Sequence, residues 1–245
     1  MALPLTSANL IKTLQEFLVV WVNQILFYNR IYNSQIYDKF KSFNLVVMKN
    51  RNPQLNEFID GLINNFLNKV LVNRQDEEKS GGFTGLNLIL MVIYNIKSNQ
   101  IKRKYIVNFN DLIINLGDTL QGGMANIHKN VESAVIDLPG VSWDEVYVQF
   151  SGILFQHIKE LKRMETLDAR RLEVKMCEDI ERDEDNDRFF KIFVSLEKSV
   201  NLVDGSWVRL DLQEESNPTT ISNFISIGEV DLQVINFDLH NEYLS

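Results

Sequence analysis

The sequence contains one cysteine, Cys177, and three histidines, His128, His157 and His240, among its 245 residues. A lone thiol excludes an intrachain disulfide and is typical of proteins in a reducing compartment. No histidine or asparagine near Cys177 in the sequence marks it as a nucleophile. The histidines lie far apart without ligand spacing, so the sequence predicts no metal site. His157 falls on the apolar side of a predicted helix, which indicates a core histidine.

Basic residues are also scarce. The chain has 25 Lys and Arg against 33 Asp and Glu, a net charge of −8 and a pI near 5.0. Strong direct binding to nucleic acid is therefore not expected, because neutralising phosphates requires clustered cations. The nearest basic group, Lys97 with residues 102–104, has hairpin-like flanks and is typical of a solvated turn.

An unbroken run of about 18 apolar residues, which a membrane span needs, is absent. The most apolar stretch, residues 14–32, is interrupted by polar residues at 15, 16, 23 and 24. Its apolar positions recur every three or four residues, which predicts a buried core helix and no membrane segment. The N-terminal residues lack a basic leader, so no signal peptide is expected, and we predict an intracellular protein.

Recognisable catalytic and cofactor motifs are missing as well. The glycine-rich residues 80–85 lack the GK[ST] ending of a phosphate-binding loop. The acidic residues 183–187 imitate the start of a calcium loop, but Arg188 replaces its glycine and Val194 its bidentate glutamate. The sequence therefore predicts no cofactor and no enzyme. An enzyme of unrecognised class using Cys177 is the weakest alternative.

The patterns that are present predict an α+β fold, because helices come mainly first and strands cluster later. A second helix begins at Pro53 after the N-cap Asn52, and Phe58 lies away from its apolar stripe. The tail from residue 219 carries two alternating runs whose phase flips after Val234, so a bulge or bend is expected there. Other predicted elements are a loop with short extended pieces at 33–52, a hairpin at 86–109, a helix at 144–164, and strands at 172–180, 190–196 and 207–212.

Specific strings carry a family resemblance. FLVVWVNQILFYNRIY at 17–32, SFNL at 42–45 and NRNPQLNEFIDGLI at 50–63 resemble HORMA-domain proteins. Within that family they are most similar to the yeast accessory subunits of translesion DNA polymerase zeta. The hairpin sequence at 88–109 follows in line. Departures include Asn33, where the family usually has proline, and longer loops near 74–85, 113–140 and 181–205.

The resemblance implies a single HORMA domain over 1–245, in which three helices pack on a mainly antiparallel β-sheet. Its core is expected at about 10–215. A C-terminal safety belt, at about 206–245, is expected to close over an extended, proline-containing peptide of the polymerase's catalytic subunit. Phe58 and Trp207 match family aromatics at the peptide pocket, and plain core packing is the alternative for both. Phe58 lacks the hydroxyl of the family tyrosine.

The resemblance also implies partner surfaces. Ile221, Ile235 and Phe237 align with the belt face that meets a deoxycytidyl-transferase scaffold. Ser151 lies near a family self-association position, which suggests a HORMA dimer. The expected role is non-catalytic, in DNA damage tolerance in the nucleus. The alternative is another HORMA adaptor, of the spindle checkpoint or the meiotic chromosome axis, that binds a closure-motif peptide.

Overall fold

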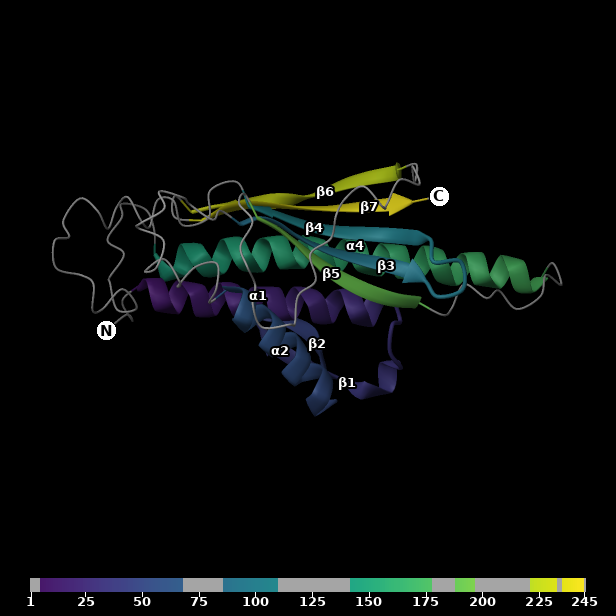
Figure 1. Ribbon diagram of the computed structural model, residues 1–245, viewed down its shortest axis with the longest axis horizontal. Coiled ribbons are helices and arrows are strands. Elements are labelled where there is room, and N and C mark those ends of the chain that lie inside the picture. The colour runs from purple at the N-terminus through teal and green to yellow at the C-terminus, as the bar shows by residue number, and fades with distance from the viewer. Residues whose placement is uncertain are drawn as a thin grey trace.

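The computed structural model describes residues 5–67, 86–109, 142–177, 188–196, 221–232 and 235–244. Within these residues, α1 and α4 lie along one face of a five-stranded sheet, and a separate two-stranded hairpin lies with α2 on the other side of α1 (Figure 1). This arrangement is α+β, as predicted. The elements are α1 (Ser7–Tyr28), β1 (Tyr37–Ser42), β2 (Leu45–Asn50), α2 (Pro53–Leu67), β3 (Leu86–Asn95), β4 (Ile101–Phe109), α4 (Trp143–Cys177), β5 (Arg188–Leu196), β6 (Ile221–Asp231) and β7 (Asn236–Leu244).

Helix α1 is the central element of the core, as predicted. Thr6 caps its N-terminus by accepting a hydrogen bond from the Asn9 amide, so the helix begins earlier than the pattern indicated. Leu14, Trp21 and Ile25 are fully buried. Among the described residues, the stretch 9–28 is long and apolar enough to cross a membrane, but 67% of it is buried inside the protein. A buried core helix meets the same criterion.

The segment predicted as a loop at 33–52 folds mainly as a β1–β2 hairpin. Its two turn residues, Phe43 and Asn44, have φ of 49° and 58°, which two-residue hairpin turns with mirror-image geometry require. Phenylalanine is an unusual residue there. Its ring is buried against Phe17 and Phe150, with centroids 6.4 and 6.0 Å away. Tertiary packing thus stabilises a turn whose sequence contains no glycine and was not predicted.

Helix α2 follows its predicted pattern. Asn52 accepts a hydrogen bond from the Gln54 amide at 3.0 Å, and Pro53 occupies the first helical position. The predicted stripe is buried at Leu55, Ile59, Ile63 and Leu67. The side chain of Phe58 lies off this stripe and is 52% exposed.

The sheet has the strand order β5-β3-β4-β7-β6, and every neighbouring pair is antiparallel. The predicted 86–109 hairpin is confirmed as β3 and β4. Asn95 stabilises its turn by accepting hydrogen bonds from the amides of Lys97 and Ser98, both at 2.9 Å. The strand predicted at 190–196 is confirmed as β5. The longer loop expected near 113–140 and the strand predicted at 207–212 lie outside the described residues.

The strand predicted at 172–180 is wrong over its described part, because α4 continues through Cys177. Alternation between apolar and charged residues at 172–177 suggested a strand, but six residues are too few to separate the two periods. The preceding residues 159–171 are mostly strong helix formers and include neither glycine nor proline. An established helix extends through such a sequence because each further residue adds a hydrogen bond without a new nucleation step.

The phase flip in the tail is a chain reversal. The Leu232 amide donates to the Ile235 carbonyl at 3.0 Å, and β6 and β7 pair on either side of it. The described apolar positions of both runs are buried, and Val230 and Phe237 are 0% exposed. Phe237 contacts Phe17 and Phe150 at centroid distances of 5.3 and 5.7 Å, so the tail helps to build the aromatic core.

Candidate functional site

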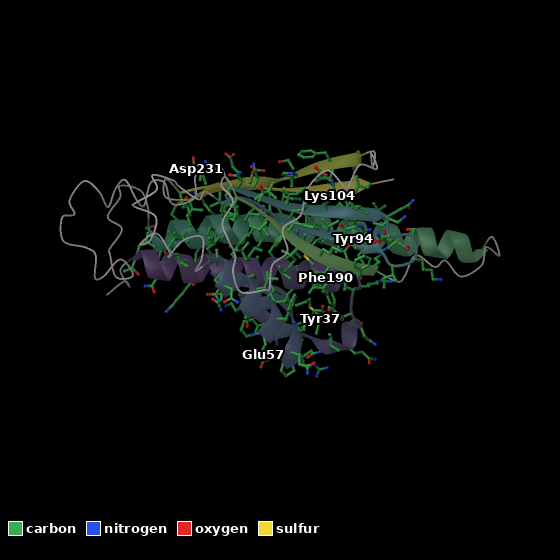
Figure 2. The ribbon with its side chains drawn as sticks, in the orientation of Figure 1. Tyr37, Glu57, Tyr94, Lys104, Phe190 and Asp231 are labelled. Atoms are coloured by element: carbon green, nitrogen blue, oxygen red, sulfur yellow. The ribbon has the colours of Figure 1, made fainter. Side chains whose placement is uncertain are left out.

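Strand β5 forms one edge of the sheet. It pairs with β3, and no further strand pairs with it in the part of the chain that the structure describes. Phe190, Ile192 and Val194 pack toward the helices, and Figure 2 shows Phe190 on this side. A nine-residue, largely apolar edge strand without proline is a template for pairing with another extended chain.

A small apolar pocket lies beside this edge. It is lined by α1, α2, β3 and β5, through Leu18, Trp21, Val22, Leu62, Ile63, Ile89, Ile192 and Val194. Phe58 precedes Leu62 by one helical turn, so the two side chains lie on the same side of α2. Phe58 therefore extends the apolar surface of the pocket along α2 to the solvent.

The tail hairpin occupies the opposite side of the sheet. Strand β7 pairs with β4, and β6 forms the far edge (Figure 1). Three strands separate β5 from β6, which at about 4.8 Å per step places the edges about 19 Å apart. Four antiparallel steps make β5 and β6 run in the same direction. Leu196 at the end of β5 and Ile221 at the start of β6 therefore lie at opposite edges of the sheet and at opposite ends of its strands.

A buried ion pair fixes the start of β5. The guanidinium of Arg103 on β4 donates to Asp168 on α4 at 2.6 Å, and Arg188, the first residue of β5, contacts the same carboxylate at 3.3 Å. Burial alone lowers the pKa of Arg103, but Tyr105 and Asp168 outweigh it and the net pKa is raised. Asp168 thus holds two strands to one helix.

The same guanidinium reaches α1 and the tail. Arg103 donates to the Asn29 side-chain oxygen at 2.8 Å, and Asn29 and Tyr105 also hydrogen-bond each other. Arg103 lies 5.8 Å from the ring of Tyr243 on β7, whose hydroxyl donates to Glu160 on α4 at 3.1 Å. Burial, followed by Tyr105 and Glu160, raises the pKa of Tyr243. The last strand is therefore tied to α4 through a neutral phenol.

The predicted site residues fall in different places. Phe58 lies on α2, one helical turn before the pocket residue Leu62, whereas Trp207 lies outside the described residues. Ile221 begins β6. Ile235 and Phe237 are 2% and 0% exposed. In this conformation the last two side chains are part of the core and present no surface to a scaffold partner, because folding the tail against the helices buries its aliphatic face.

Ser151 lies on α4 within an exposed apolar surface. Val148 and Phe155, one helical turn before and after it, are 66% and 53% exposed. Tyr147 is 41% exposed and contacts the Phe43 ring at 5.7 Å. The surface around Ser151 thus has the apolar character of a protein contact.

The described histidines form no catalytic constellation. His157 is fully buried between Trp21 and Tyr105, with ring centroids 6.2 and 6.0 Å away, and burial lowers its pKa to about 3. His240 contacts Asp238 at 3.1 Å. Among the described residues no three His, Cys, Asp or Glu side chains gather in a way that could hold a metal ion.

Sequence reasoning missed the open edge of β5 and the Arg103 network. Local periodicity identifies a strand but not its place in a sheet, so no sequence signal could have marked β5 as an edge. An arginine at 103 inside the predicted hairpin was visible, but it was assigned with its basic neighbours to a solvated turn. Its burial depends on Asp168 and Asn29, which come from other parts of the chain.

Solved structures give a clear comparison. A chain of the "Crystal Structure of Mitotic Checkpoint Complex" superposes with a TM-score of 0.61 at 13% identity, covering 95% of this chain and 97% of that one. "Structure of C. elegans HTP-2 bound to HIM-3 closure motif, P21 form" superposes with a TM-score of 0.50 at 13% identity, covering 94% and 87%. These neighbours are HORMA-domain proteins.

The chain has the HORMA fold. No family model and no curated protein sequence matches it. The HORMA fold thus emerges here from the arrangement of α1, α2, α4 and the antiparallel sheet, at an identity too low to transfer a partner or an activity.

Proposed function

We propose that this chain is a non-catalytic HORMA adaptor that binds an extended peptide of a partner protein along the outer edge of β5. The observation that carries this proposal is the position of β5, a long apolar edge strand beside a pocket, while the tail hairpin occupies the opposite edge. Backbone pairing at an open edge supplies affinity that tolerates sequence variation, and the apolar side chains along β5 favour apolar side chains in the peptide.

Trp207 lies between β5 and β6 in the sequence. In the proposed complex the safety belt, at about 206–245, crosses the bound peptide, so that release of the peptide requires local unfolding of the tail. Such a device lowers the dissociation rate more than it raises the association rate. The HTP-2 neighbour bound to a HIM-3 closure motif supports the idea of a peptide ligand for this fold.

The finer proposal is a role in translesion synthesis. In it, the peptide is a proline-containing segment of the catalytic subunit of DNA polymerase zeta, and the complex works in the nucleus with a deoxycytidyl-transferase scaffold. This rests on the sequence strings at 17–32 and 50–63. Ser151 and its exposed neighbours form the proposed dimer contact.

A second candidate is an adaptor of the spindle checkpoint or the meiotic axis. It is supported by the structural neighbours, one from a mitotic checkpoint complex and one, HTP-2, bound to a HIM-3 closure motif. The ligand decides between the two, since the fold is shared.

The deciding experiment is calorimetry of the full chain with closure-type peptides from a polymerase zeta catalytic subunit, from a checkpoint partner and from an axis partner. Tightest binding of the polymerase peptide supports the finer proposal, and tightest binding of another supports the second candidate. Absence of binding by every peptide overturns the adaptor proposal. A complex that persists in 1 M salt indicates trapping, since charge-driven contacts are largely screened there.

A further inference from the structure

The β1–β2 hairpin forms its own two-stranded sheet, separate from the five-stranded one (Figure 1). Backbone groups on the outer edge of β2 form hydrogen bonds with side chains of α1. The Gln24 side chain donates to the Met48 carbonyl at 2.9 Å and accepts from the Met48 amide at 3.1 Å. Asn23 accepts from the Asn50 amide at 3.4 Å. Two core amides thus take the place of a third strand beside β2.

The outer edge of β1 has no such cover among the described residues. Met48 directs its backbone groups toward α1, and its register partner on β1 is Lys39. In an antiparallel pair, directly opposite residues both bond each other or both point away. The amide and carbonyl of Lys39 therefore point outward, as do those of Lys41 two residues on. Both lysines are exposed, and neither forms an ion pair with a described residue.

The edge is basic and partly apolar although the chain is acidic. The hairpin and the residue after it carry Lys39, Lys41, Lys49 and Arg51 against a single acid, Asp38, which pairs with Arg51 at 3.5 Å. Lys49 lies 5.0 Å from the ring of Phe40, and Phe40 and Val46 are 50% and 67% exposed. Lys39 and Lys41 project from the same face of β1. The charges favour an anionic partner.

We propose that the free edge of β1 binds an acidic peptide strand. An extended chain pairs with the outward amides and carbonyls of Lys39 and Lys41, and its alternate carboxylates contact the two ammonium groups. Nucleic acid and lipid phosphates could meet the charges, but neither offers a backbone that pairs with a strand edge, so a polypeptide fits both features. This site is separate from β5 and does not depend on the proposed closure peptide.

Calorimetry on the full chain tests the proposal with a twelve-residue probe that alternates glutamate and threonine. We expect measurable binding, weakened at least tenfold by the double substitution Lys39→Glu, Lys41→Glu. The matched control, Lys159→Glu with Lys162→Glu, changes two exposed lysines of α4 by the same charge and is expected to stay within twofold. A probe with alternate backbone amides N-methylated is expected to bind at least tenfold more weakly to the unchanged chain.

If the N-methylated probe binds as tightly as the unmodified probe, strand pairing is overturned. If the α4 control variant loses as much affinity as the Lys39→Glu, Lys41→Glu variant, the site at β1 is overturned. An oligothymidylate that binds more tightly than the peptide, and is lost with Lys39 and Lys41, assigns the patch to nucleic acid instead. The proposal is also overturned if no probe binds and the Lys39→Glu, Lys41→Glu chain self-associates in sedimentation. The two lysines would then serve only to prevent edge-to-edge pairing between copies of the chain.

Discussion

Asp168 and Arg103 form a 2.6 Å ion pair in which the arginine side chain is only 8% exposed. The carboxylate comes from α4 and the guanidinium from β4. Because Arg188 of β5 shares the carboxylate, this one contact positions the start of the proposed peptide-binding edge.

Substitution Asp168→Ala is therefore expected to destabilise the fold by about 3 kcal/mol or more, because it leaves a buried guanidinium without its carboxylate. Substitution Glu165→Ala, which breaks the exposed pair with Arg30, is expected to cost less than about 1 kcal/mol. Urea denaturation of both variants measures the difference. Equal costs would mean that the Arg103 site is as well solvated as the surface pair.

His157 predicts a pH dependence of stability. Its pKa is about 3 in the fold against 6.5 when exposed, so the unfolded chain binds a proton that the folded chain rejects. Stability is fully present above pH 6.5 and falls as pH drops toward 3, by up to about 1.4 kcal/mol per pH unit. Replacing His157 with phenylalanine removes this contribution.

Denaturation at pH 7 and pH 5 checks this prediction. The unchanged chain is expected to lose about 2 kcal/mol more than the His157→Phe variant between these values. His240, which is partly exposed beside Asp238, provides a control through His240→Asn. Identical pH profiles for the unchanged chain and His157→Phe would contradict a neutral buried imidazole.

Substitutions at the two adjacent turn residues of the β1–β2 hairpin are expected to change stability differently. Phe43→Ala removes a buried ring and is expected to cost about 3 kcal/mol. Asn44→Gly keeps a positive φ in a residue suited to it and is expected to be neutral or slightly stabilising. Thermal unfolding of both variants measures this. A small loss in Phe43→Ala would mean that relief of backbone strain offsets the lost packing.

Removal of the Tyr243 hydroxyl is expected to weaken the tail locally. Tyr243→Phe removes the hydrogen bond to Glu160 and is expected to cost about 1 kcal/mol. The ring and its contact with Arg103 remain, so the loss should concentrate in β6 and β7. Hydrogen exchange of those amides, with β3 as internal reference, reports it. Uniform loss of protection in β3 and β7 alike would instead indicate that the tail opens only with the whole fold.

If the proposed peptide site is correct, three aromatic residues contribute unequally to peptide affinity. Trp207→Ala is expected to reduce peptide affinity by at least about 2 kcal/mol, as for aromatic hot spots, and Phe58→Ala by a smaller amount. Phe224→Ala is a matched control, because Phe224 is 55% exposed on β6 at the opposite edge of the sheet. Calorimetry with the tightest closure peptide compares the three. Unchanged affinity in Trp207→Ala would refute the belt assignment.

Much of the fold was predictable from the sequence because its signals are local. Helix periodicity placed the buried faces of α1 and α2, the Asn52–Pro53 cap located a helix start, and alternation identified the β3–β4 hairpin. The same local logic failed at 172–177, where strand-like alternation lies within a helix that was already formed. Alternation marked Phe237 as an apolar position of the tail and the family resemblance placed it at a partner surface, whereas in the structure its side chain is buried.

The sequence by itself determined the buried apolar faces of α1, α2 and the β3–β4 hairpin, because hydrophobic spacing matches the helix and strand periods directly. The tertiary structure alone decided that β5 lies at an edge, that β7 pairs with β4, and that Arg103 meets Asp168. Strand order and buried charge pairing join residues that are distant along the chain, and no local spacing records which distant partner completes a contact.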